Sequence, residues 1–162
     1  MLDLGSGGGL PGLVVATYRP GLELTLLEAR QRACRFLREA VVELALEGVS
    51  VVEARAEDAA RTPDLRGMFS AVVARSFGPP AVTAECAVGF LRKGGRLVVS
   101  EPPGDDTTAL RWPSSGLDEF GLGAPVRGGG AGGSFVSLEK LHDDERWPRR
   151  VGIPAKRPLW TA

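Results

Sequence analysis

The sequence predicts an α/β domain built on a mostly parallel β-sheet. Hydrophobic periodicity alternates between strand-like and helix-like windows through roughly the first hundred residues. Parallel strands need a crossover connection, which is usually a helix, so this alternation is typical of a parallel sheet. A glycine-rich turn joins the first expected strand to the first expected helix, and a second glycine run lies between two strand-like segments near the end.

The expected elements follow a regular order. Strands are expected near Met1–Leu4, Leu22–Leu27, Val49–Ala54, Phe69–Ala74 and Arg96–Ser100, and helices near Leu10–Tyr18, Arg30–Leu46, Glu57–Arg61 and Pro80–Leu91. The second helix is the clearest, because Ala33, Leu37, Val41 and Leu44 form one apolar stripe. After Glu101 the signal decays into Pro102-Pro103-Gly104 and a mixed polar region. The strand-like segments Ala124–Arg127 and Phe135–Leu141, on either side of the glycine run from Gly128 to Gly133, predict a terminal β-hairpin.

Composition limits the kind of protein. A chain of 162 residues with 43% apolar residues can build the core of one domain. Its 20 basic and 20 acidic residues cancel, so any nucleic-acid site must be local. Cys34 and Cys86 lie in apolar helical contexts without metal-ligand spacing, which indicates reduced packing residues and no metal site. We find no membrane-spanning or export segment and therefore expect a cytoplasmic protein.

The glycine-rich turn runs from Asp3 to Gly12 and points to a nucleotide-like cofactor. Glycines let the backbone approach a ligand, and the N–H groups of the following helix point toward it. The segment from Gly7 to Gly12 formally satisfies the dinucleotide pattern. However, an ionised Asp3 would repel a pyrophosphate and attract a cationic amine or sulfonium, which favours S-adenosylmethionine over NAD. An NAD-dependent oxidoreductase and a turn without a ligand stay open as alternatives.

The expected cofactor contacts lie at the ends of the first three strands. From the turn itself they are Asp3, Gly5, Ser6, Gly7, Gly9 and Leu10. Glu28, with Ala29, ends the second strand and can accept hydrogen bonds from both ribose hydroxyls, although an acid at a helix N-terminus is the alternative interpretation. Ala56 and Glu57 follow the third strand and could contact the adenine edge, or simply begin a capped helix.

Arg75 follows the fourth strand, where it would face both the transferable methyl group and the acceptor. We therefore assign it a catalytic role as well as a cofactor contact. Its guanidinium could hold a phosphate group. A salt bridge at the sheet edge is the alternative.

Several motifs together resemble the family of small-subunit ribosomal RNA guanine-N7 methyltransferases known as RsmG, or glucose-inhibited division protein B. They are the segment Asp3 to Gly12 with its Leu10-Pro11-Gly12, Leu26-Leu27-Glu28 with Arg32 and Phe36-Leu37, Arg55-Ala56-Glu57, Ala74-Arg75, Lys93-Gly94-Gly95, and the tail from Trp147 to Leu159. The resemblance implies a Rossmann-like class I fold dependent on S-adenosylmethionine, with a mostly parallel seven-stranded sheet ending in a β-hairpin. It also implies methyl transfer to N7 of a guanine in ribosomal RNA.

The resemblance further implies that Arg32, Arg55 and Arg75 handle the RNA substrate. With guanine as the acceptor, Arg75 could hold a phosphate or the guanine O6, since donation to N7 would occupy the attacking lone pair. The tail, residues 146–162, contains basic residues without acids, and we expect Arg149 and Arg150 to bind phosphate there. Alternatively, its prolines and tryptophans pin it while its bases stay solvated. We expect residues 1–145 to form the cofactor-binding domain, with the tail packed on it, and ribosomal RNA or the small ribosomal subunit as partner.

The sequence departs from the family pattern at two places. Family members usually carry a helical extension before the first strand, whereas this chain begins at the strand. Where the family typically has Lys-Gly after the fifth strand, this chain has Glu101-Pro102. A carboxylate there would repel phosphate or carbonyl oxygens unless Arg75 or another base pairs with it. A divergent paralogue acting on a small molecule and a non-catalytic S-adenosylmethionine-binding module therefore stay open.

Overall fold

The computed structural model of the protein describes residues 1–102, 107–130 and 133–161. In chain order the elements are β1 (Leu2–Leu4), α1 (Gly12–Tyr18), β2 (Leu24–Glu28), α2 (Gln31–Glu43), β3 (Val49–Glu53), α3 (Ala56–Ala59), β4 (Phe69–Ala74), α4 (Pro80–Val88), β5 (Leu91–Glu101), α5 (Thr108–Arg111), α6 (Ser114–Glu119), β6 (Val126–Gly130), β7 (Gly133–Glu139) and α7 (Ile153–Lys156). The predicted alternation of strands and helices is confirmed.

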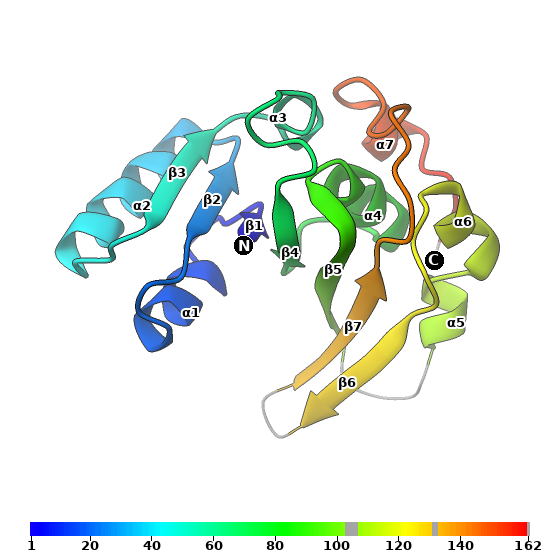
Figure 1. Ribbon diagram of the computed structural model, residues 1–162, viewed down its shortest axis with the longest axis horizontal. Helices are drawn as coiled ribbons and strands as arrows, with labels where there is room; N and C mark the ends of the chain where they lie inside the picture. The colour runs from blue at the N-terminus through cyan, green and yellow to red at the C-terminus, as the bar shows by residue number, and fades with distance from the viewer. Residues whose placement is uncertain (103–106, 131–132, 162) are drawn as a thin grey trace.

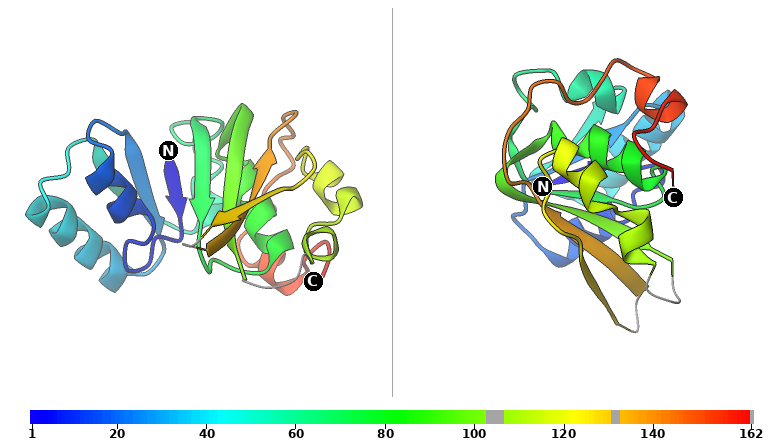
Figure 2. Two further views of the ribbon diagram at one scale, coloured as in Figure 1. Left: turned by 90° about the horizontal axis from the view of Figure 1, so that it is seen from below. Right: turned by 90° about the vertical axis from the view of Figure 1, so that its right-hand side faces the viewer.

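In the described residues the strands form one seven-stranded sheet in the order β3-β2-β1-β4-β5-β7-β6 (Figure 1). The strands β1 to β5 run parallel, and β7 pairs antiparallel with β5 and with β6. The β6–β7 hairpin extends beyond the neighbouring strands (Figure 1 and Figure 2). Chain order reverses beside β1, which lies between β2 and β4. In open α/β sheets, ligands bind beyond the carboxyl ends of the strands at such a reversal.

The core lies on both faces of the sheet, as alternation along β2 shows. Leu24 and Leu26 pack with Leu13 of α1 and Leu37 of α2, whereas Leu27 belongs to the apolar cluster that includes side chains of α3, α4 and α6. Successive strand side chains point to opposite faces, so α1 and α2 cover one face and α3, α4 and α6 pack on the other. The parallel strands are therefore buried between layers of helices, as βαβ crossovers require.

The tail makes defined contacts with α4 and with the end of α6. Every residue of α4 is buried, including Glu85, whose carboxylate accepts hydrogen bonds from the backbone and side chain of Arg149. Trp147 is buried, packs edge-on against Phe120 and donates from its indole N–H to Glu119 O. The aromatic and ionic contacts hold the first part of the tail on the helical layer.

The segment after Glu101 contains structure that periodicity did not predict. The short helices α5 and α6 occupy part of the expected mixed polar region, and α7 lies within the tail. Helices this short contain too few turns to show a hydrophobic period. Their position depends on Trp112 and Leu117, which enter the core, and on Trp160, which stacks over Gly116.

Two predicted strand boundaries differ from the structure, both at segments that contain glycine. β5 begins at Leu91 rather than near Arg96, and its register with β4 shifts across the Lys93-Gly94-Gly95 segment, from Phe69 opposite Leu91 to Ala71 opposite Arg96. β6 extends through Gly128 to Gly130, where the Phe135 ring lies over Gly128 so closely that a Cβ there would be 2.3 Å from it. Part of the expected loop, residues 131–132, and the Pro103-Gly104 pair lie outside the described residues.

Candidate functional site

The glycine-rich turn closes over the carboxyl ends of β1 and β2. The N–H groups of Gly5 and Ser6 donate to Leu27 O, at 2.9 and 3.0 Å. The N–H of Gly7 donates to Oε2 of Glu28 at 2.9 Å. Gly5 adopts a φ of 72°, and the Phe77 ring lies so near that a Cβ on Gly5 would be 2.5 Å from it. Glycine at this position therefore permits both the turn and the approach of Phe77.

Asp3 lies beneath the turn rather than in the wall of a cavity. Its Oδ2 accepts the N–H of Gly12 at 2.9 Å, and a Cβ on Gly12 would be 2.5 Å from that same oxygen. The carboxylate thus fixes the start of α1 against β1. Its Oδ1 is buried with no hydrogen-bond partner among the described residues. Burial raises the pKa of Asp3 to about 6, although the Gly12 N–H partly opposes this effect.

Glu28 ends β2 with its carboxylate held in one orientation. Oε1 accepts the N–H groups of Ala29 and Arg30 and the Nε–H of Arg30. In the part of the chain that the structure describes, Oε2 accepts the N–H of Gly7 alone. Burial would raise the pKa of this carboxyl, but the hydrogen bonds from Arg30 and Gly7 outweigh burial and lower it. Glu28 is therefore anionic at neutral pH, with acceptor capacity left on Oε2.

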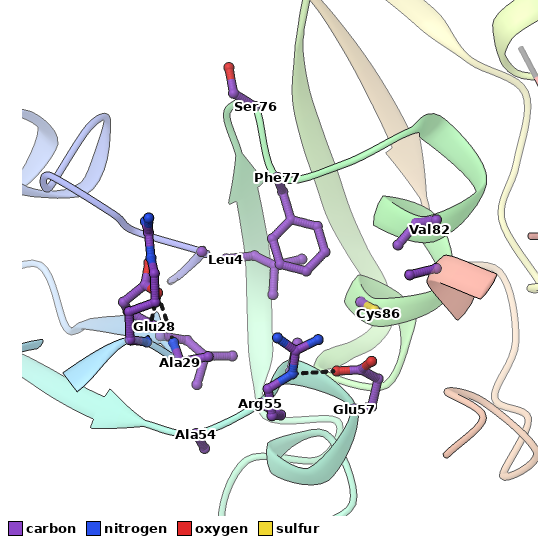
Figure 3. A pocket seen from close by; sticks show the side chains of 15 residues that line it. Leu4, Glu28, Ala29, Ala54, Arg55, Glu57, Ser76, Phe77, Val82 and Cys86 are labelled. Atoms are coloured by element: carbon purple, nitrogen blue, oxygen red, sulfur yellow. Dashed lines mark hydrogen bonds and ion pairs between the residues drawn. The ribbon is translucent and has the colours of Figure 1, made fainter. Parts of the chain in front are cut away.

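These groups surround a cavity of about 310 Å³ at the switch point of the sheet. Its walls come from the ends of β1, β2, β3 and β4, from α4 and from α7. The lining residues are Leu4, Gly5, Leu27, Glu28, Ala29, Arg30, Ala54, Arg55, Ala56, Glu57, Ser76, Phe77, Val82, Cys86 and Ala155. In Figure 3 the Phe77 ring points between Glu28 on one side and Val82 and Cys86 on the other. We call this space the first cavity; its volume is at the lower end of the roughly 300 to 1,000 Å³ of small-molecule sites.

A second cavity of about 340 Å³ adjoins the first across Ser76 and Phe77, which line both. Its other lining residues are Gly78, Pro80, Val99, Ser100, Glu101, Pro102, Arg111 and Trp112. Ser76 adopts a φ of 54°, in the left-handed region that non-glycine residues seldom occupy. Such strain is often found at functional sites. If each cavity held a ligand, the Ser76-Phe77 turn would lie between the two ligands.

Of the residues predicted to bind the cofactor, the structure brings one group together around the first cavity. Gly5, Glu28, Ala29, Ala56 and Glu57 all line it. Asp3, Ser6, Gly7, Gly9 and Leu10 do not line it, and they form the body of the turn instead. The shape of this turn is set by two hydrogen bonds, from the N–H of Gly12 to Asp3 and from the N–H of Gly7 to Glu28.

The predicted arginines lie in different surroundings. Arg75 and Arg32 are exposed, line neither cavity, and form no hydrogen bond or ion pair within the described part of the chain. Arg55 lines the first cavity, with its Nε 3.7 Å from Oε2 of Glu57. The role of Arg75 in catalysis stays a prediction.

The tail contributes differently from what its charge suggested. The guanidinium of Arg149, predicted to bind RNA, forms an ion pair with the buried Glu85 at 2.6 Å. Arg150 is exposed. The N–H of Gly152 donates to Oε1 of Glu57 at 2.9 Å, and Ala155 reaches the first cavity. Part of the tail is thus a wall of that cavity, a role that no local sequence pattern signals.

Glu101 does not leave an uncompensated negative charge beside the second cavity. The sequence analysis expected repulsion unless Arg75 or another base paired with Glu101, and Arg111 is that base, with its Nε 2.7 Å from Oε2 of Glu101. The partner is therefore Arg111 rather than Arg75. This pairing links β5 to α5, which sequence periodicity had not revealed.

The remaining titratable and ligating groups are consistent with a site that uses few ionisable side chains. Cys34 and Cys86 are free and buried, as predicted, and burial raises the pKa of the Cys86 thiol, which stays neutral. Within residues 1–102, 107–130 and 133–161, no group of three or more His, Cys, Asp or Glu side chains could hold a metal ion. No helix in the same ranges is both long and apolar enough to cross a membrane.

The first cavity fits S-adenosylmethionine by the chemistry of its donors and acceptors. Oε2 of Glu28 can accept a ribose hydroxyl, and Ala29, Ala54 and Ala56 leave room for a flat ring. Oδ1 of Asp3, which lies beneath the turn without a hydrogen-bond partner in the described ranges, belongs to a carboxylate whose negative charge a nearby cationic group would stabilise. Among the lining residues that sequence reasoning missed are Phe77, Val82 and Ala155, which are apolar and show their role only in three dimensions.

Comparison with known proteins agrees with this site. The family model GidB, described as rRNA small subunit methyltransferase G, matches residues 1–101. Ribosomal RNA small subunit methyltransferase G of Dehalococcoides mccartyi (strain CBDB1) is 37% identical over 166 residues, which cover 98% of this chain and 70% of the relative. The chain therefore spans about 70% of the length of that relative.

Solved structures share the fold at low identity. The S-adenosylmethionine-dependent methyltransferase SibL in its apo form has a TM-score of 0.66 at 21% identity, over 87% of this chain and 50% of SibL. A putative S-adenosylmethionine-dependent methyltransferase from Methanococcus maripaludis has a TM-score of 0.64 at 14% identity, over 89% of this chain and 78% of its own. These likenesses establish the class I methyltransferase fold. Together with the family match and the curated relative, they show that the chain belongs to the GidB family, the rRNA small subunit methyltransferases G.

Proposed function

We propose that the protein transfers a methyl group from S-adenosylmethionine to N7 of a guanine in small-subunit ribosomal RNA. The observation that carries this proposal is the pair of adjoining cavities at the switch point of the sheet, in a chain of the GidB family. The first cavity has the anionic Glu28 for a ribose and small residues for a flat ring. The second shares the Ser76-Phe77 turn with it and has room for the acceptor base.

This reaction depends on alignment of the two reactants more than on proton transfer. When bound, S-adenosylmethionine supplies an electrophilic methyl group. Guanine N7 already has a lone pair and no proton, so the protein needs no general base. Holding two reactants in line and excluding water lowers the barrier by itself. The lining of both cavities agrees with this requirement, because neither contains a histidine and the Cys86 thiol is neutral.

The roles of individual residues are part of the same proposal. Glu28 accepts the ribose hydroxyls, and Ala56 and Glu57 contact the adenine edge. The exposed guanidinium groups of Arg32, Arg75 and Arg150 lie outside both cavities and bind RNA phosphates around the acceptor. Since the molecule has no net charge, these contacts are local. We place the protein in the cytoplasm, with the small ribosomal subunit or its RNA as its partner.

A transfer assay with labelled cofactor tests the proposal. The full chain is incubated with methyl-tritiated S-adenosylmethionine and, in separate reactions, with small ribosomal subunits, deproteinised small-subunit RNA and a mixture of small metabolites. We expect label in the RNA fraction and none in the metabolites. Label only in metabolites would replace RNA by a small-molecule acceptor. Cofactor binding without transfer to any of them would mark the chain as a non-catalytic binding module.

A further inference from the structure

Glu101 and Arg111 form a buried ionic cluster at the wall of the second cavity. The Glu101 side chain is 0% exposed, and its Oε2 lies 2.7 Å from Nε of Arg111. Its Oε1 accepts the indole N–H of Trp112 at 3.0 Å and lies 3.5 Å from Nη2 of Arg111. A carboxylate this deeply buried is stable only when it is paired and hydrogen-bonded, so the cluster fixes Arg111 strongly.

The backbone around Arg111 is also fixed. Its carbonyl oxygen accepts the indole N–H of Trp160 at 2.9 Å, and the next residue, Trp112, is buried in the core. One edge of the guanidinium faces Glu101. Its Nη1 donates to no group in the described residues, and the side chain is 30% exposed while it lines the second cavity. Arg111 thus presents a held, unused hydrogen-bond donor at that cavity.

The chemistry of this donor favours a neutral carbonyl over a phosphate. Glu101 cancels the charge of Arg111 at close range, so the cluster attracts anions weakly but still offers directional N–H groups. Guanine carries its carbonyl O6 beside N7 on the same edge, whereas adenine has an amino donor at the position of O6. A donor to O6 orients that edge and leaves the N7 lone pair free.

We propose that Arg111 recognises the acceptor guanine by donating from its guanidinium to O6 in the second cavity, with Glu101 as the positioning residue. This inference rests on the proposed function and names the acceptor contact within it. It assigns the contact with the guanine O6 to Arg111 instead of to the exposed Arg75. The shared Ser76-Phe77 turn then keeps the recognised base next to the first cavity.

The first test compares Arg111→Met with the wild-type full chain. We expect kcat/KM for ribosomal RNA to fall about 10- to 100-fold, as for loss of one charge-assisted hydrogen bond, with an unchanged Kd for S-adenosylmethionine. Arg96→Met is the matched control. Arg96, in β5, also forms an ion pair with a glutamate, Glu139 of β7, but it lines neither cavity. Equal kcat/KM values for Arg111→Met and Arg96→Met would overturn the inference.

A second variant separates recognition from a purely structural ion pair. In the double variant Glu101→Gln, Arg111→Met both charges are removed together, so no buried charge is left unpaired and the side chain at position 111 has no N–H donor. We expect its urea midpoint to exceed that of Arg111→Met, while its kcat/KM stays as low. Recovery of wild-type kcat/KM in the stably folded double variant would show that Arg111 serves only to neutralise Glu101.

A substrate analogue tests the contact with O6 itself. Once the methylated guanine has been mapped with the wild-type protein, an RNA is prepared with 2-aminopurine at that position, which lacks O6 and keeps N7. We expect the analogue to slow the wild-type protein about 10-fold or more and to slow Arg111→Met no further. Equal slowing of both would refute the contact. If the wild-type protein methylates no guanine at all, the proposed function fails instead.

Discussion

The buried Asp3 is predicted to lower the stability of the protein as the pH rises. Asp3 is 1% exposed, and only one of its oxygens has a hydrogen-bond partner among the described residues. Replacing Asp3 by Asn keeps an acceptor for the Gly12 N–H and removes the charge. The variant therefore isolates what ionisation of this group costs the folded protein.

The magnitude follows from the pKa of Asp3, which burial raises from 3.8 to about 6. At about 1.4 kcal/mol per unit, the difference amounts to about 3 kcal/mol. Because the folded pKa is above the unfolded one, the folded protein holds the proton more tightly. This group's contribution to stability is fully present below about pH 4 and is lost as the pH rises through about 6.

Urea unfolding of wild-type protein and Asp3→Asn from about pH 4 to about pH 8 measures this effect. We expect the free energy of unfolding of the variant, relative to wild type, to rise by about 3 kcal/mol across that range, since other titrations cancel in the difference. Asp118→Asn, which removes an exposed carboxylate of α6, is the control and should show no comparable rise. A difference that is constant with pH for Asp3→Asn would refute the reasoning. At about pH 8 the same variant should bind S-adenosylmethionine more weakly by calorimetry.

Three further substitutions test the site and its supports. Glu28→Gln should weaken S-adenosylmethionine binding by about 1.5 to 3 kcal/mol in calorimetry, because a charged acceptor is lost; equal affinity would remove Glu28 from the site. Gly12→Ala would place a methyl group 2.5 Å from Asp3 Oδ2 and should lower the free energy of unfolding by about 1 to 3 kcal/mol, whereas an unchanged urea midpoint would show that α1 can shift. Arg149→Met leaves Glu85 buried without its ion pair and should cost about 3 kcal/mol in the same assay; a loss near zero would mean that solvent reaches Glu85.

The central part of the fold could be predicted because its signals are local. Alternating apolar residues in β2, the stripe containing Leu37 in α2 and the turn from Asp3 to Gly12 each lie within a short window of sequence. The order of these segments then implies a parallel sheet and its switch point. The positions of Glu28, Ala29 and Ala56 at the cavity follow from that topology, since Glu28 ends β2, Ala29 follows it and Ala56 lies just beyond β3.

The missing parts depend on contacts between distant residues. The role of Arg111 depends on its ion pair with Glu101, and the helix that contains Arg111 is too short to show a hydrophobic period. Likewise, Glu57 was expected to read adenine, but it also accepts the N–H of Gly152 from the tail. The basic charge of the tail predicted phosphate binding by Arg149, whereas the structure pairs its guanidinium with the buried carboxylate of Glu85. Tertiary pairing of this kind leaves no mark in a local sequence window.

Analysis of the methylated nucleosides tests the central claim most directly. Small-subunit RNA is incubated with the wild-type protein and labelled S-adenosylmethionine, digested to nucleosides under conditions that preserve 7-methylguanosine, and separated against standards. The two adjoining cavities and the absence of a required base predict that the label coelutes with 7-methylguanosine, and that Glu28→Gln reduces it. Label in any other nucleoside, or in none, would contradict the account.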